Sequence, residues 1–124
     1  MNHRTLFKSF SYAFEGVYHT IRHNQNMRIH IAIALLVMTA SLILRVNPFE
    51  MGVLGIMILL VFMAEMINTA IEEMVDLITT EHKQQAKIAK DVASGMVLIA
   101  TVGSVIVGIL IFVPHILKLL YLSK

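Results

Sequence analysis

The sequence predicts an all-α membrane protein in which an N-terminal interfacial amphipathic helix is followed by three transmembrane helices. The apolar content of 57% and the mean hydropathy of +0.77 exceed what a soluble core of 124 residues requires. Three long apolar runs separate shorter polar segments. We expect one membrane domain over residues 1–124, with the interfacial helix at about 4–24 and the spans at about 28–45, 51–72 and 90–113.

The segment before the first span predicts a helix that lies in the membrane interface. Its apolar residues recur at helical spacing between charged ones: Leu6, Phe7, Phe10, Phe14, Val17, Tyr18 and Ile21. It lacks the order of charged region, apolar core and small-residue site that marks a signal peptide, so we expect no cleaved leader.

The apolar runs cover residues 29–44, 51–64 and 92–113. The second run alone spans about 21 Å of a hydrocarbon layer about 30 Å thick, so its helix must continue to about Ile71. Glu65 and Asn68 would then lie inside the membrane, with Glu72 at its interface. We expect Pro114 to end the third run, because proline lacks the N–H that a helix uses.

Seven of the ten basic residues flank the spans on one side, which predicts a cytoplasmic N-terminus and second loop. These are Arg4, Lys8, Arg22, Arg28, Lys83, Lys87 and Lys90, against Arg45, Lys118 and Lys124 on the other side. The link 45–50, with Asn47 and Pro48, is too short for a domain.

Composition excludes several function classes. The absence of cysteine removes disulfides, thiolate metal sites and cysteine nucleophiles. The charge of +2 is spread along the chain, so we expect no nucleic-acid partner. Ala100, Ser104 and Gly108 place small residues at every fourth position of the third span, which favours close helix contact within the chain or in an oligomer.

Polar residues form a single stripe along the second span: Glu65, Asn68, Glu72 and Asp76, with Thr69 beside them. A carboxylate at the centre of a bilayer costs at least about 2.5 kcal/mol, so such residues serve a function or have a partner. The alternative is a helix that ends near Ala64, with Glu65 reaching to water.

Lys83, Lys87, Lys90, Asp91 and Ser94 share a helical face that leads into the third span. We expect these bases to face the acidic stripe, an arrangement that suits a phosphate. The alternative is an ordinary solvated charged face.

Phosphoryl transfer needs a base, a positioned hydroxyl and cations on the phosphates. Glu65 could act as the base and Glu72 could hold magnesium, with Lys90 supplying positive charge. The sequence has no GxxxxGK[ST] or GxGxxG loop and no HRD or DFG element, which excludes the soluble kinase architectures. These residues alone leave the reaction undecided.

His19 and His23 stand four residues apart, a spacing that two metal ligands can use. No matching third ligand follows, so we favour ordinary interfacial histidines. We expect His30 to pack or cap near a glutamate or backbone groups.

Two segments resemble the bacterial integral-membrane diacylglycerol and undecaprenol kinases: EMINTAIEEMVD at residues 65–76 and AKDVASG at residues 89–95. The resemblance extends to YAFEG at residues 12–16 and NMRIH at residues 26–30. It implies an ATP- and Mg²⁺-dependent lipid kinase of the bacterial cytoplasmic membrane. It also implies a homotrimer whose active sites are shared between neighbouring subunits.

Carried over by position, the resemblance implies roles for individual residues. Glu65 matches the catalytic base, and Glu72 matches a magnesium ligand. The nucleotide contacts would be Tyr12, Asn24, Glu72, Glu81, Lys90 and Asp91, and the lipid headgroup would lie near Glu65, Asn68 and Ser94.

The sequence departs from the family pattern at two places. Asn24 stands where the family has an acidic metal ligand, four residues before the arginine that matches Arg28. An amide oxygen can still bind magnesium, or Asp91 can help. Beside Glu81, His82 and Lys83 also differ from the pattern.

The NMRIH segment and the IFVP ending at residues 111–114 favour undecaprenol as the lipid alcohol, with diacylglycerol as the alternative. Two rivals stay open: a kinase-like protein that binds nucleotide without turnover, and a non-enzymatic scaffold or ion-conducting oligomer lined by Glu65.

Overall fold

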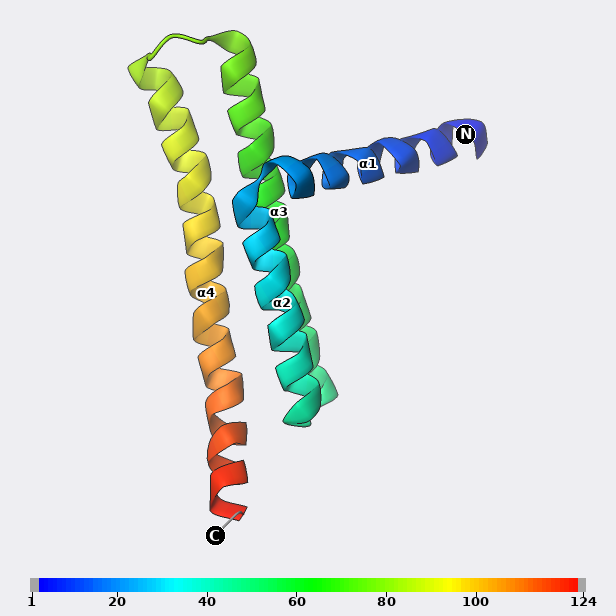
Figure 1. The fold of residues 1–124 in the computed structure, drawn as a ribbon, viewed down its shortest axis with the longest axis vertical. Helices are drawn as coiled ribbons and strands as arrows, with labels where there is room; N and C mark the ends of the chain where they lie inside the picture. The colour runs from blue at the N-terminus through cyan, green and yellow to red at the C-terminus, as the bar shows by residue number, and fades with distance from the viewer. Residues whose placement is uncertain (1–2, 123–124) are drawn as a thin grey trace.

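The computed structural model describes residues 3–122 of the chain and the side chains of residues 5–122. Within these residues the chain forms the helices α1 (His3–His23), α2 (Gln25–Ile43), α3 (Pro48–Ile78) and α4 (Gln84–Leu122), and it contains no strand (Figure 1). The side chains of Arg4 and Lys124, counted above among the basic flanks, lie outside this part. Because α2, α3 and α4 are each long and apolar enough to cross a membrane, the expected all-α membrane class is confirmed.

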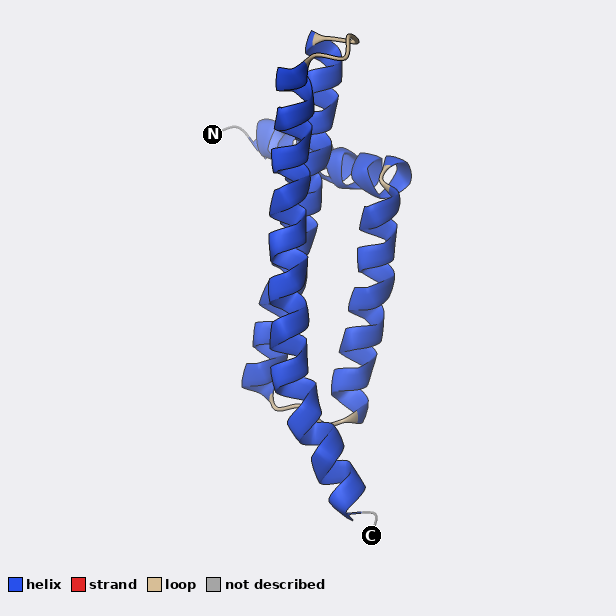
Figure 2. Cartoon of the chain, turned by 90° about the vertical axis from the view of Figure 1, so that its left-hand side faces the viewer, coloured by secondary structure: helices blue, strands red, loops and turns tan. Residues whose placement is uncertain are grey.

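Helix α1 leaves the other three helices at a steep angle, as both views show (Figures 1 and 2). The corner is fixed by Asn24, whose side-chain oxygen accepts a hydrogen bond from the Met27 N–H at 3.2 Å and so caps α2. Arg28 Nη1 donates to the carbonyls of Ile21 at 3.3 Å and Arg22 at 2.7 Å. Since the last carbonyls of a helix lack partners within it, Arg28 stabilises the end of α1.

The link between α2 and α3 is short and well capped. Arg45 adopts a left-handed conformation with φ 53°, which ends α2. Asn47 accepts a hydrogen bond from the Glu50 N–H at 2.9 Å, and Pro48 takes the first position of α3, where its missing N–H costs little.

Helix α3 contains 31 residues and is therefore about 46 Å long, well beyond a hydrocarbon layer of about 30 Å. It continues past Glu65 to Ile78. The alternative of a helix that ends near Ala64 is thereby excluded.

Helix α4 continues through Pro114 to Leu122, the last residue that the structure describes, so the prediction that the helix of the third span ends at this proline is wrong. Proline removes one hydrogen bond and clashes with the carbonyl four residues earlier, at a cost of about 3 kcal/mol. The helical residues on both sides offset this cost, and α4 bends towards its C-terminal end (Figure 2).

The helices bury different kinds of residue at the two ends of the bundle. Near the α2–α3 link, Val46, Leu54 and Ile111 form a small apolar core. From Glu65 onward to the α3–α4 loop, the buried residues of α3 are polar: Glu65, Asn68 and Thr69. Since buried polar groups require partners, this second region is where a site is expected.

Candidate active site

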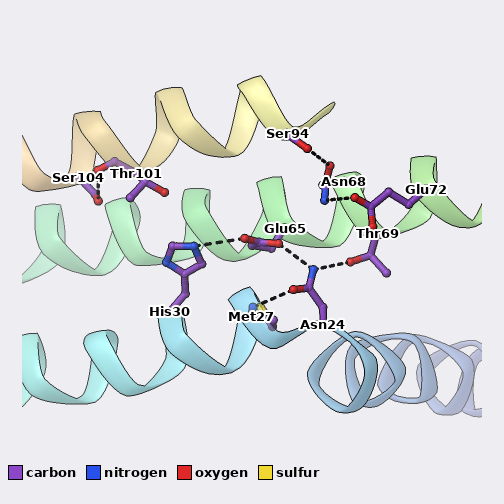
Figure 3. Close-up of polar contacts among 10 residues, drawn as sticks. All are labelled: Asn24, Met27, His30, Glu65, Asn68, Thr69, Glu72, Ser94, Thr101 and Ser104. Carbon is purple, nitrogen blue, oxygen red and sulfur yellow. Dashed lines mark hydrogen bonds and ion pairs between the residues drawn. The ribbon is translucent and has the colours of Figure 1, made fainter. Parts of the chain in front are cut away.

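Glu65 of α3 is fully buried, with 0% of its surface exposed. Asn24 Nδ2 donates to its Oε2 at 2.8 Å, and His30 Nε2 lies 3.2 Å from its Oε1 (Figure 3). The histidine contact has ion-pair distance but not hydrogen-bond geometry, so Oε1 is buried without a hydrogen-bonding partner. An unsatisfied buried polar atom costs about 1–3 kcal/mol, so Glu65 keeps one oxygen available for another group at that cost.

His30 therefore lies near a glutamate, as expected. The sequence did not indicate which glutamate, because helical spacing relates residues within one helix and not between α2 and α3.

Asn24 turns its amide nitrogen towards α3. Nδ2 donates to both Glu65 Oε2 and, at 3.0 Å, Thr69 Oγ1, while Oδ1 accepts from the Met27 N–H (Figure 3). The opposite amide orientation would place an oxygen against the carboxylate, so the network fixes this one. The role of Asn24 as a partner of Glu65 was missed in the sequence, although an asparagine before a helix is a capping signal.

The stripe continues along α3 towards the loop. Asn68 Nδ2 donates to Glu72 Oε1 at 3.2 Å, and Ser94 Oγ of α4 donates to Asn68 Oδ1 at 3.4 Å (Figure 3). The structure thus brings together three residues, Asn68, Glu72 and Ser94, that were expected near one another.

A cleft of about 470 Å³ lies between α3, α4 and their loop. Its charged lining residues are Asp76, Glu81, Lys83, Lys87, Lys90 and Asp91. Lys90 Nζ lies 2.6 Å from Asp76 Oδ1, so one of the three expected bases faces an acid of α3. Lys87 pairs with Asp91 at 3.1 Å and Lys83 with Glu81 at 3.3 Å, so every lysine in the cleft has a carboxylate.

Three carboxylates of α3, those of Glu65, Glu72 and Asp76, lie in a row from the buried interior to this cleft. At a rise of about 1.5 Å per residue, Glu72 lies about 10 Å along α3 from Glu65, and Asp76 lies about 16 Å from it. The stripe therefore links the buried carboxylate to the charged cleft within one helix.

Tyr12 is 66% exposed on α1 and has no hydrogen bond among the described residues. Because α1 points away from α3 and α4, the structure does not bring Tyr12 to the cleft of the same chain (Figure 1).

His19 and His23 of α1 stack on each other, with ring centroids 4.3 Å apart, and His19 Nε2 lies 3.4 Å from Glu73 Oε1. Across the described part of the chain, no group of three His, Cys, Asp or Glu side chains is close enough to hold a metal ion by itself.

Comparison with known proteins agrees with this geometry. Residues 11–112 match the model of the prokaryotic diacylglycerol kinase family, a range that contains every site residue named above. The chain belongs to this family. It is 40% identical to undecaprenol kinase of Bacillus subtilis over 88% of this chain and 89% of that enzyme. It is 39% identical to diacylglycerol kinase of Synechocystis sp. over 93% of this chain and 66% of that enzyme.

Membership of the prokaryotic diacylglycerol kinase family confirms two expectations. The protein is a membrane protein, and its enzyme class is that of a lipid kinase. The individual roles of Glu65, Asn68 and the cleft residues are taken up below as proposals.

Proposed function

We propose that this protein uses ATP to phosphorylate undecaprenol to undecaprenyl phosphate at the cytoplasmic face of a bacterial membrane. The observation that carries the proposal is the buried Glu65, held by Asn24 with one oxygen lacking a hydrogen bond. The similarity to the Bacillus subtilis enzyme over nearly its whole length supports undecaprenol. Diacylglycerol is the alternative acceptor, because a diacylglycerol kinase is almost equally similar.

In this proposal Glu65 takes the proton of the lipid hydroxyl as the hydroxyl oxygen attacks the γ-phosphorus of ATP. A bond forms between the lipid oxygen and the γ-phosphorus, the bond from the γ-phosphorus to the bridging oxygen breaks, and ADP leaves. His30 and Asn24 act as positioning residues, since both contact the carboxylate of Glu65.

In this proposal the part of the lipid tail next to the hydroxyl lies in an apolar region near Glu65. A small cavity of about 70 Å³ lies between α2, α3 and α4, lined by His30, Ile33, Leu54 and Val61 among others. Because His30 borders this cavity and also contacts Glu65, a tail along these residues would bring its hydroxyl end towards the carboxylate.

The charged cleft suits the nucleotide. Lys83, Lys87 and Lys90 would exchange their carboxylate partners for phosphate oxygens, which leaves Asp76, Glu81 and Asp91 to face a cation or ribose. This exchange would account for the presence of as many carboxylates as lysines in the lining of the cleft.

Glu72 fits magnesium. It is half-buried, and one of its oxygens accepts a hydrogen bond from Asn68, while the other has no hydrogen bond or ion pair among the described residues. Magnesium that binds with a nucleotide needs only one or two carboxylates besides phosphate oxygens, and when bound it would neutralise charge on the phosphates. Asn24 uses its oxygen to cap α2, so we assign it to Glu65 instead of to the metal.

We also propose a homotrimer with sites completed by neighbouring subunits. The supporting observation is that α4 has only 6% of its most apolar window buried within the chain, and that Tyr12 lies apart from the cleft of its own subunit. Mixing Glu65→Gln with Tyr12→Ala subunits tests this, because shared sites would give the mixed oligomer more activity than the two variants measured separately predict.

The cytoplasmic orientation rests on the distribution of basic residues. The chain has no cysteine, so single cysteines at positions 82 and 47 report the two faces through a membrane-impermeant thiol reagent. In intact cells only Asn47→Cys should react.

The function itself is tested by phosphate transfer from labelled ATP to undecaprenol and to diacylglycerol in mixed micelles with magnesium. Wild type is compared with Glu65→Gln and with Glu73→Gln, an exposed acid of the same helix outside the site. Faster transfer to undecaprenol, lost only in Glu65→Gln, would support the proposal. Faster transfer to diacylglycerol would select the alternative, and no transfer by folded protein would favour a scaffold or pore.

A further inference from the structure

The end of α2 and the last turns of α4 lie at the end of the bundle opposite the α3–α4 loop (Figure 1). A second cleft lies between them. Its volume is about 650 Å³. Arg45, His115 and Lys118 supply its polar lining, and Ile43 and Leu119 are among its apolar residues. Arg45 and Lys118 are far apart in the sequence, and the packing of the helices brings both to one cleft.

The two cations of this cleft are unpaired. Within residues 5–122, neither the Arg45 nor the Lys118 side chain has an ion pair or a hydrogen bond. The acid at this end, Glu50, lies 3.5 Å from His115 Nε2 and does not line the cleft. The cleft therefore has a net positive charge without an internal partner.

The position of Arg45 adds an independent argument. Its φ of 53° lies in the left-handed region, where glycine is the favoured residue and any side chain raises the conformational cost. A glycine would form the same link more easily. The arginine side chain thus destabilises the link, which indicates that it serves a function other than folding.

We propose that this cleft binds the phosphate headgroup of an anionic phospholipid in the leaflet opposite the active site. Arg45 and Lys118 would contact the phosphate, and the acyl chains would lie along Ile43 and Leu119. The apolar lining favours a lipid phosphate over free phosphate, which has no group to place there. This site is separate from the proposed kinase reaction.

The test measures lipid retained by the purified full-length protein in detergent, by native mass spectrometry, with phosphatidylglycerol or phosphatidylcholine added. Each cation removed should weaken phosphatidylglycerol binding about fivefold, and Arg45→Asn with Lys118→Gln should weaken it about 30-fold. Asparagine is chosen because it tolerates the left-handed conformation, so this variant keeps the fold. The matched control, Arg45→Lys with Lys118→Arg, retains both charges and should bind as wild type does within about threefold.

Three results would overturn the proposal. One is equal retention of phosphatidylglycerol by wild type and the neutral double variant, when both show the same helical content. Another is equal retention of phosphatidylcholine by the wild type. The third is displacement of the lipid by inorganic phosphate at the same concentration, which would indicate a site for the free anion.

Discussion

The two ends of this bundle each have a charged cleft, and they differ in how the cations are paired. At the α3–α4 loop, Lys83, Lys87 and Lys90 all contact carboxylates. At the other end, Arg45 and Lys118 have no such partner among the described residues. A cleft with balanced charges suits a ligand that brings both signs, such as a nucleotide with magnesium, whereas unpaired cations suit a purely anionic group.

The buried interior shows the same division. Near the α2–α3 link the core is apolar, while near the loop Glu65 is held by a polar network that includes Asn24. An apolar core stabilises the fold by burial alone. Burial of a carboxylate destabilises the fold, so a carboxylate that stays buried is expected to serve the function. Substitutions at the polar end should therefore affect activity most.

The largest effect is expected for Glu65→Gln. Loss of the general base should lower turnover by about 10²–10⁴-fold, because the amide cannot take the proton of the alcohol. The KM for ATP should change little, since Glu65 is not among the residues that line the cleft proposed for the nucleotide. Steady-state kinetics with varied ATP measure both, and a variant with wild-type turnover would contradict the role.

His30→Gln should lower turnover by up to about 100-fold, because the carboxylate of Glu65 loses the imidazole that lies 3.2 Å from its Oε1 and helps to position it. The KM for ATP should be unaffected. His23→Gln is the matched control, since His23 is exposed on α1 and, within the described part of the chain, its side chain hydrogen-bonds and stacks with His19 of the same helix alone. Equal activities for the two variants would remove His30 from the site.

Lys90→Met should raise the KM for ATP about tenfold, because a charge-assisted contact to phosphate is lost and Asp76 is left without its partner. Lys118→Met removes a cation from the other cleft and should leave this KM unchanged. Should both substitutions raise the KM equally, the assignment of nucleotide to the loop end would fail.

The smallest effects concern stability at the α2–α3 link. Arg45→Gly should raise the free energy of unfolding by about 0.5 kcal/mol, because relief of the left-handed strain exceeds the entropy cost of glycine. Asn47→Ala should lower it by about 1 kcal/mol through loss of the cap on α3. Unfolding by SDS in mixed micelles measures both, and a destabilised Arg45→Gly protein would show that the arginine serves the fold.

Much of the architecture could be predicted from local pattern. The spacing of apolar residues predicted a surface helix and three spans, and the length of the second apolar run required α3 to continue past Glu65. The predicted helix end at Pro114 was wrong, because the cost of a single proline is smaller than the stabilisation from the helical residues on both sides of it.

The sequence by itself determined the membrane class, the family and the polar stripe from Glu65 to Asp76, since these depend on composition, on sequence motifs and on spacing within one helix. Only the tertiary structure decided that Asn24 and His30 are the residues that contact Glu65. It also decided that Arg45 and Lys118 line one cleft. These contacts depend on how each helix is rotated against its neighbours, and a helix such as α2, which is apolar around most of its circumference, does not encode that rotation in its own sequence.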